Sequence, residues 1–244
     1  MTEKGKIETL AAVLREQIKR EEFGTRGRFP SVTQLAKAHQ VARSTAYQAL
    51  LLLQAEGLVV LKDSSFYVNP VINITTSPTP TFEQALTKQG LQPFVRNIID
   101  PEIIVMPEEI AAIFGQPAGS HVIHRYRVQG KRDIPYRLSE YWYPERLARK
   151  YLQRMKDEPD YDTLEAIKSD LGIVRQKVHD DVLSRIPTKR EAILLSIPRS
   201  SPVQEVRRTN RSPDGSILMH HRIVFVGPYS MLSYDYELLD QTNQ

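Results

Sequence analysis

Arg43, Ser44 and Thr45 stand together at the start of a predicted helix, after a turn that ends a shorter helix. A guanidinium can bind a guanine edge or a phosphate, and the two hydroxyls suit phosphate oxygens. Two helices joined by a tight turn present the start of the second helix to the major groove of DNA. This spacing predicts a DNA-binding helix-turn-helix; the alternative is an ordinary helix start in a domain that contacts protein.

Arg125 and Arg127 lie two residues apart on a predicted strand, so they share one face. Two guanidinium groups on one face suit a phosphate or a carboxylate. Glu140, on the next predicted strand, could accept hydrogen bonds from the hydroxyls or an amine of a ligand. The alternative is that Arg125 and Glu140 form an inter-strand ion pair on a solvated face.

Other patterns argue against catalysis and metal binding. The chain has no cysteine, so it has neither a thiol nucleophile nor a thiolate ligand. His220 and His221 are adjacent in a predicted strand and point to opposite faces, as do Asp180 and Asp181. We find no Ser/His/Asp motif and no glycine-rich phosphate loop. We therefore expect no catalytic residue, no metal site and no cofactor.

Length and charge are consistent with two domains, one of which binds DNA. The 244 residues exceed what one small domain needs. The net charge is +4, and residues 1–70 hold ten Lys and Arg against seven Asp and Glu, so the excess lies in the smaller segment. No run of about 18 apolar residues and no signal-peptide pattern occurs, so we expect a cytoplasmic protein without a membrane partner.

The N-terminal pattern predicts three helices and a hairpin. An apolar stripe marks a helix over 6–20, and Ser31 with Gln34 predicts a capping box at the second helix. The third helix is expected over 43–56, and Gly57 ends it. Strands over 58–61 and 66–68, joined by a turn, complete a winged helix-turn-helix.

These residues resemble the DNA-binding domain of GntR-type bacterial transcription regulators. The matching positions are Phe29, Pro30, Ser31, Leu35, Ala36, Val41, Arg43, Ser44, Thr45, Ala49, Leu50, Leu53, Ala55, Glu56, Gly57, Leu58 and Val59. Thr33 and Tyr47 stand where the family usually has arginine, and Ser64 and Ser65 replace the usual wing glycines. The DNA-contacting set that this resemblance implies is Ser31, Thr33, Arg43, Ser44, Thr45, Tyr47, Gln48, Lys62 and Ser64.

The rest of the chain reads as a linker and an α+β domain. Residues 70–80 are rich in Pro, Thr and Ser and predict an extended linker. Strand patterns follow over 94–99, 121–129, 134–143, 173–186, 202–211, 217–226 and 231–238, and helical patterns over 107–114, 144–155, 162–171 and 188–195. Runs of strands with few helices predict an antiparallel sheet.

This domain resembles the UTRA effector-binding domain of the HutC subfamily of GntR regulators, whose fold is like chorismate lyase. The matching residues are Arg125, Arg127, Pro135, Glu140, Tyr141, Tyr143, Pro144, Thr163, Leu164, Gly172, Glu191, Ala192, Asp214 and Gly215. The resemblance implies an effector site at Arg125, Arg127, Glu140, Thr163, Arg175 and His220. Tyr229 and His220 depart from the family, which usually has acids there.

We therefore expect a homodimeric transcription repressor that binds double-stranded DNA at a palindromic operator. Its domains are a winged helix-turn-helix over 1–69, a linker over 70–80, and an effector-binding and dimerisation domain over 81–244. A small phosphorylated or carboxylate-bearing effector would change the orientation of the DNA-binding domains, with the linker as the joint. The alternatives are a repressor without an effector, whose second domain only dimerises, and a lyase-like enzyme.

Overall fold

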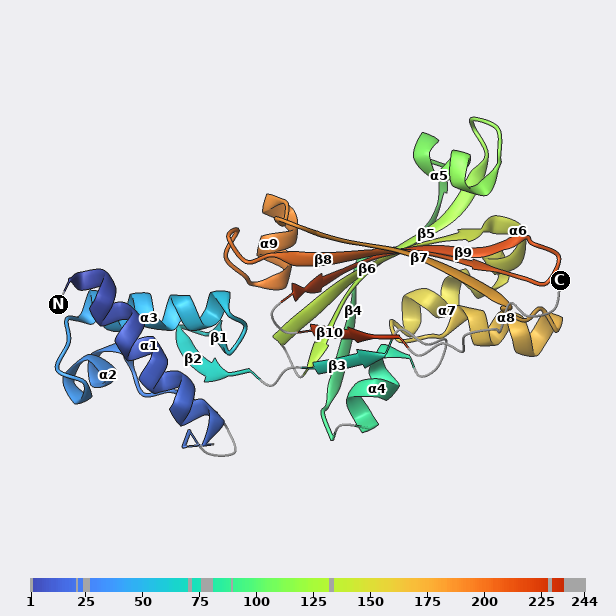
Figure 1. Cartoon of the computed structure of the whole chain (residues 1–244). Helices are drawn as coiled ribbons and strands as arrows, with labels where there is room; N and C mark the ends of the chain where they lie inside the picture. Colours follow the sequence, from blue (N-terminus) through green and yellow to red (C-terminus); the bar gives the residue numbers. More distant parts are fainter. Residues whose placement is uncertain are drawn as a thin grey trace, which may run out of the picture.

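The computed structural model describes residues 2–20, 22–23, 27–69, 72–75, 81–88, 90–131, 134–227 and 230–234 (Figure 1). Its N-terminal domain has three helices and a two-stranded hairpin. They are α1 (Glu3–Lys19), α2 (Val32–Ala38), α3 (Arg43–Ala55), β1 (Val59–Lys62) and β2 (Ser65–Val68). These helices and strands follow one another in the order of a winged helix-turn-helix, as predicted.

Local sequence signals fix the ends of these helices. Ser31 and Gln34 form the predicted capping box of α2. Gly57 takes φ +78° after α3, a conformation that glycine adopts at little cost. Ala46 and Ala49 are fully buried on α3, which lets α1 and α2 pack closely against it.

The wing turn uses two residues that are not glycine. Asp63 and Ser64 have φ of 44° and 62°, the left-handed values that a two-residue hairpin requires at both central positions. Beside this hairpin, Arg28 makes a short antiparallel bridge to Tyr67.

The C-terminal domain is built on a six-stranded antiparallel sheet in the order β4-β5-β6-β9-β8-β7. Its strands are β4 (Pro93–Val105), β5 (His121–Lys131), β6 (Ile134–Pro144), β7 (Lys177–Arg185), β8 (Val203–Arg211) and β9 (Ile217–Val226). The predicted α+β antiparallel fold is confirmed. A separate parallel pair joins β3 (Ile72–Thr75) to β10 (Ser230–Ser233).

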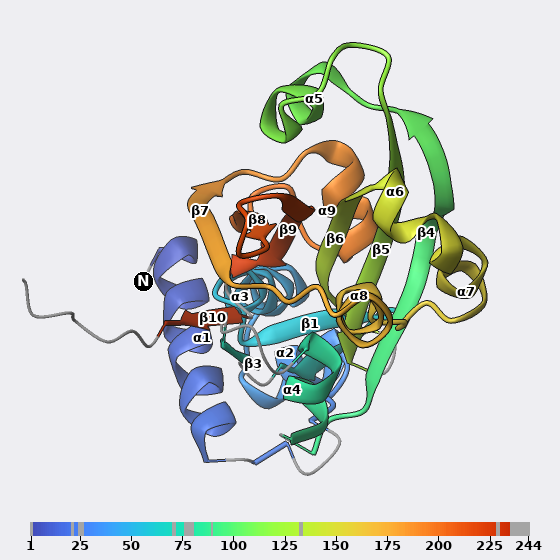
Figure 2. The same ribbon diagram turned by 90° about the vertical axis from the view of Figure 1, so that its right-hand side faces the viewer.

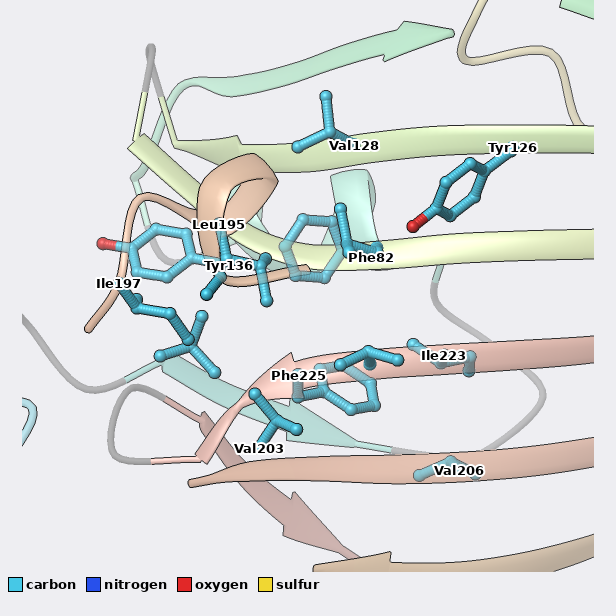
Figure 3. Packing of buried hydrophobic residues seen from close by; sticks show 14 of the residues in the cluster. Phe82, Tyr126, Val128, Tyr136, Leu195, Ile197, Val203, Val206, Ile223 and Phe225 are labelled. Carbon is cyan, nitrogen blue, oxygen red and sulfur yellow. The ribbon is translucent and has the colours of Figure 1, made fainter. Parts of the chain in front are cut away.

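Short helices surround this sheet. They are α4 (Phe82–Lys88), α5 (Glu108–Phe114), α6 (Glu145–Ala148), α7 (Leu152–Asp157), α8 (Thr163–Leu171) and α9 (Lys189–Leu195), with a 3-10 turn at Arg149–Tyr151. Figure 3 shows the main core, where Leu195 of α9 and Phe82 of α4 pack with side chains of the sheet. The turned view places α5 at the far end of the long β4–β5 hairpin (Figure 2). No helix within the described ranges is long and apolar enough to cross a membrane.

The structure refines several predicted elements. Residues 72–75, inside the expected linker, form β3, and α4 has no counterpart in the sequence prediction. The strand expected from residue 173 begins at Lys177, and the helix expected over 144–155 is broken by the 3-10 turn. Thr188 and Glu191 form the predicted capping box of α9. Residues 70–71, 76–80 and 235–238 of the expected linker and last strand lie outside the described residues.

Candidate DNA-binding surface and ligand cavity

The start of α3 presents the residues expected to bind DNA. Arg43 and Ser44 are exposed in the first turn, and Ser31 and Thr33 are exposed at the start of α2. Ala42, the N-cap of α3, provides no side-chain hydrogen bond to the helix. Backbone N–H groups at such a helix start favour a phosphate. Arg43, Ser44 and this helix start together form a surface suited to a DNA backbone.

Thr45 is placed differently from the expectation. It is only 2% exposed because its side chain lies on the buried face of α3. Ser31 is exposed, but its Oγ already accepts a hydrogen bond from the Gln34 backbone N–H. The exposed recognition surface therefore contains Ser44 but not Thr45.

Tyr47 and Gln48 are exposed on the next turn of α3. The Tyr47 ring meets the Phe66 ring of the wing edge-on, with centroids 6.1 Å apart. At the wing turn Ser64 is exposed and Lys62 is half-buried. An exposed cation that the sequence analysis missed, Arg28, donates a 3.1 Å hydrogen bond to the Ser65 Oγ. The sequence signal for Arg28 is that it directly precedes Phe29 and Pro30, two of the residues that match the family pattern.

One face of the large sheet lines a cavity of about 520 Å³, which we call the central cavity. Helices α4 and α8, with the chain just before and after α8, supply most of the remaining lining. Five basic side chains line it: Arg127, Arg137, Lys168, Arg175 and Arg208. Four acids, Glu83, Asp160, Asp162 and Glu165, also lie on its walls. A cavity with this lining suits a ligand with an anionic group and several hydrogen-bonding groups.

A buried network holds α4 against the sheet at this cavity. Gln129 donates to Glu83, and its Oε1 accepts hydrogen bonds from Arg137 Nε at 2.8 Å and Ser139 Oγ at 2.6 Å. The Arg137 guanidinium lies 4.1 Å from the centroid of the Phe82 ring. Burial acts to raise the pKa of the Glu83 carboxyl, but the charges of Arg137 and Arg127 and the hydrogen bonds to this carboxyl together outweigh burial and lower the pKa. Burial lowers the pKa of Arg137 to about 10, so both groups are charged at neutral pH.

The two arginines predicted from strand spacing share a face, but they have different roles. Arg125 is fully buried, and its Nη1 and Nη2 donate to backbone carbonyl oxygens of Met155, Glu158, Pro159 and Tyr161 at 2.6–3.4 Å. It thereby fixes the loop before α8 and does not line the central cavity. Arg127 lines the cavity and donates to the Pro159 carbonyl at 2.7 Å and to the Tyr141 hydroxyl.

Thr163, Arg175 and His221 also line the central cavity. The Thr163 Oγ1 is buried and has no hydrogen-bond partner within the described ranges. The same is true of His221 Nε2, and burial lowers the pKa of this imidazole well below its usual value, so the ring is neutral. Its ring stacks on Tyr141 with centroids 3.8 Å apart. Buried polar atoms without partners are costly unless a ligand or water satisfies them.

Glu140 and His220 lie on the opposite face of the sheet, so neither lines the central cavity. Glu140 pairs with His124 at 2.9 Å and with Arg222, rather than with Arg125. His220 Nδ1 lies 3.0 Å from the Thr209 Oγ1. The sequence analysis had placed Glu140 and His220 at the effector site. Side chains alternate between the two faces along β6 and β9, so Tyr141 and His221 face the cavity, whereas Glu140 and His220 face away from it.

The sequence analysis missed Arg137, Arg208, Lys168 and Glu83. Arg137 has the same strand parity as Tyr141, which was the available signal for its face. The packing of α4 and α8 on the sheet and contacts between strands decide the other positions, and this packing does not follow from local spacing. Tyr229 lies outside the described residues. Within the described part of the chain, no cluster of three or more His, Asp or Glu side chains could hold a metal ion.

Comparisons with known proteins match two separate stretches of the chain. Residues 6–68 match the family of bacterial regulatory proteins described as gntR, and residues 88–229 match the UTRA domain. The HTH-type transcriptional repressor NagR of Bacillus subtilis (strain 168) is 30% identical over 226 residues, which cover 91% of this chain and 90% of NagR. The mannosyl-D-glycerate transport/metabolism system repressor MngR of Escherichia coli (strain K12) is 23% identical, covering 88% and 89% of the two chains.

Solved structures share this fold. PhnF from Mycobacterium smegmatis superposes with a TM-score of 0.64 at 21% identity, covering 93% of this chain and 99% of PhnF. The C-terminal domain of the histidine utilization repressor from Pseudomonas syringae pv. tomato covers 60% of this chain with a TM-score of 0.53 at 16% identity, and all of that domain is matched.

Proposed function

This chain belongs to the gntR family of bacterial regulatory proteins and carries a UTRA domain, and from that premise we propose that it represses transcription in response to a small anionic metabolite. Membership of this family makes it a transcription regulator, which confirms the expectation that it is not an enzyme. NagR and MngR are both repressors by name, which favours repression here. We place the protein in the cytoplasm, where its DNA target lies.

The lining of the central cavity supports the proposed ligand class. Five cations line a cavity of about 520 Å³, and the buried Thr163 hydroxyl lacks a partner within the described ranges. Arginine and a hydroxyl at a helix start are groups that bind phosphate or carboxylate oxygens. MngR regulates a system for mannosyl-D-glycerate, a sugar that carries a carboxylate. We propose a ligand that joins a sugar-like polyol to a phosphate or carboxylate.

The proposed mechanism needs two copies of the chain. Two DNA-binding domains related by two-fold symmetry fit a palindromic operator whose half-sites are about one helical turn apart. A ligand changes operator affinity only if it binds the two arrangements of these domains with different affinity. Residues 70–80, between the domains, are the proposed joint.

A footprint upstream of the protein's own gene tests DNA binding. We expect a protected palindrome, and Arg43→Ala should weaken binding by about 1–3 kcal/mol. Lys88→Ala, which removes an exposed charge from α4 of the C-terminal domain, is the matched control. Absence of any protected palindrome at low salt would contradict the proposal.

A thermal-shift screen with hexose 6-phosphates, inorganic phosphate and uncharged hexoses tests the ligand class. We expect a hexose phosphate to raise the Tm of the wild type, and Arg175→Ala on the cavity wall to reduce the shift. Arg222→Ala, on the opposite face of the sheet, should retain it. If operator binding is found but no anion shifts the Tm, the effector-independent repressor is favoured.

A further inference from the structure

Asn69, the residue after β2, joins the two domains. Its backbone N–H donates a 2.9 Å hydrogen bond to the Leu58 carbonyl, and its Nδ2 donates to the Gly57 carbonyl at 3.2 Å. Gly57 directly follows the C-cap of α3. Asn69 is only 3% exposed, so its position is tied to the end of the recognition helix.

The remaining polar atom of this side chain bonds to the other domain. Asn69 Oδ1 accepts a 2.7 Å hydrogen bond from the hydroxyl of Tyr136 on β6. Tyr136 is fully buried in the main core of the C-terminal domain, near Leu195 and Ile197 (Figure 3). One buried hydrogen bond thus connects the end of the recognition helix to the core of the ligand-binding domain.

A β-bulge directs Tyr136 toward this junction. Along β5 and β6, Gln129 pairs with Arg137 and Gly130 pairs with Pro135, so Tyr136 is the extra residue between two registered pairs. A bulge changes the direction in which a side chain points. A Cβ on Gly130 would lie 1.9 Å from the Ile134 carbonyl oxygen, so this backbone requires glycine opposite the bulge.

The same bulge borders the central cavity. Arg137, the neighbour of Tyr136, lines the cavity and donates to Gln129 across the bulge. Glu83 of α4 binds this same Gln129. A ligand that displaces the Arg137 guanidinium therefore acts on the strand segment that places the Tyr136 hydroxyl.

We infer that Asn69 and Tyr136 are positioning residues that set the DNA-binding domain against the ligand-binding domain and couple the central cavity to the recognition helix. Their hydrogen bond holds the recognition helix in the ligand-free arrangement that binds the operator. When a ligand displaces the Arg137 guanidinium, the restraint that this hydrogen bond places on the recognition helix is weakened. The expected effect on operator affinity rests on the proposed function, whereas the link between the two domains rests only on the contacts of Asn69 and Tyr136.

Tyr136→Phe tests the inference with the smallest change, since it removes one hydroxyl and keeps the ring in the core. Tyr126→Phe is the matched control, because Tyr126 belongs to the same core cluster but has no such bond to Asn69. Hydrogen exchange of the full-length protein should be several-fold faster over residues 57–69 in Tyr136→Phe only. Operator affinity should fall about two- to tenfold, the range for one lost hydrogen bond.

The coupling itself is tested with Asn69→Ala, the double variant and a hexose 6-phosphate that binds the wild type. If both residues act through one bond, the double variant should exchange no faster than Asn69→Ala, and the probe should change operator affinity less in both single variants than in wild type. Unchanged exchange in Tyr136→Phe would overturn the inference, as would faster exchange with unchanged operator affinity. If wild type binds no operator, the proposed function fails, while the exchange comparison still decides whether the junction exists.

Discussion

Asp180 and Arg208 face each other across β7 and β8 and form a bidentate ion pair. Arg208 Nε and Nη2 donate to the two carboxylate oxygens of Asp180, both at 2.7 Å. Their side chains are 11% and 12% exposed. Arg208 also lines the central cavity, so this pair fixes one of the cavity's cations while supporting the edge strand.

Asp180→Asn should destabilise the protein by about 3 kcal/mol, because removing one partner leaves a nearly buried charge poorly compensated. Urea unfolding at pH 7 measures the change. Glu145→Gln, which removes an exposed pair with Arg149 one turn along the chain, should have no measurable effect. Equal stability of Asp180→Asn and wild type would show that the pair contributes little.

The wing offers a test of backbone strain. Ser64 adopts φ 62°, which favours glycine, so Ser64→Gly should stabilise the N-terminal domain by roughly 0.5 kcal/mol. The neighbouring Ser65→Gly, on strand β2, should have the opposite effect, because glycine weakens a strand interior. Thermal unfolding of both variants checks the two signs, and a lower Tm for Ser64→Gly would contradict the argument.

Much of the fold could be predicted because local signals repeat along the chain. The capping boxes at Ser31 and Thr188 and the positive φ at Gly57 follow from residue types at short spacing. β3 could not be predicted, because its four residues pair with β10, more than 150 residues away in the sequence. α4 is also held by distant contacts, through Glu83 and Phe82.

The candidate site could be predicted only in part, for a related reason. Strand alternation placed Arg125 and Arg127 on one face. Only the folded loop shows that backbone carbonyls accept the hydrogen bonds of the Arg125 guanidinium. Neighbouring residues of a strand face opposite sides of the sheet, so an error of one position selects the wrong face. The sequence analysis chose His220, but His221 lines the cavity. Helix periodicity had a similar limit at Thr45, which packs inward although it adjoins the exposed Ser44.

His220 should make stability depend on pH between 4 and 6.5. Burial lowers its pKa to about 4, whereas an unfolded histidine has a pKa near 6.5. In this window the unfolded chain binds a proton that the folded protein does not, so the free energy of unfolding falls as pH falls, by about 1.4 kcal/mol per pH unit. Above pH 6.5 both forms are neutral and this dependence disappears.

His220→Gln should therefore flatten the dependence without abolishing it, because burial shifts the pKa of His221 in the same direction. Urea unfolding from pH 7.5 to 4.5 measures the slope. His179→Gln, an exposed histidine on β7, is the control and should keep the wild-type slope. A wild-type slope in His220→Gln would contradict the assignment.

Replacing Thr163 with valine should raise the stability of the ligand-free protein and lower its affinity for the ligand. Its buried hydroxyl lacks a partner within the described ranges, so the nearly isosteric Thr163→Val removes an unsatisfied polar atom. We expect the ligand-free variant to be more stable, by up to about 1 kcal/mol. Affinity for a hexose phosphate should fall about 10- to 100-fold, since a hydrogen bond to a charged group contributes about 1.5–3 kcal/mol. Calorimetric titration and urea unfolding of Thr163→Val, with Thr163→Ser as the variant that keeps the hydroxyl, separate the two effects. If Thr163→Val instead lowers stability while leaving the ligand affinity intact, Thr163 supports the fold and does not contact the anion.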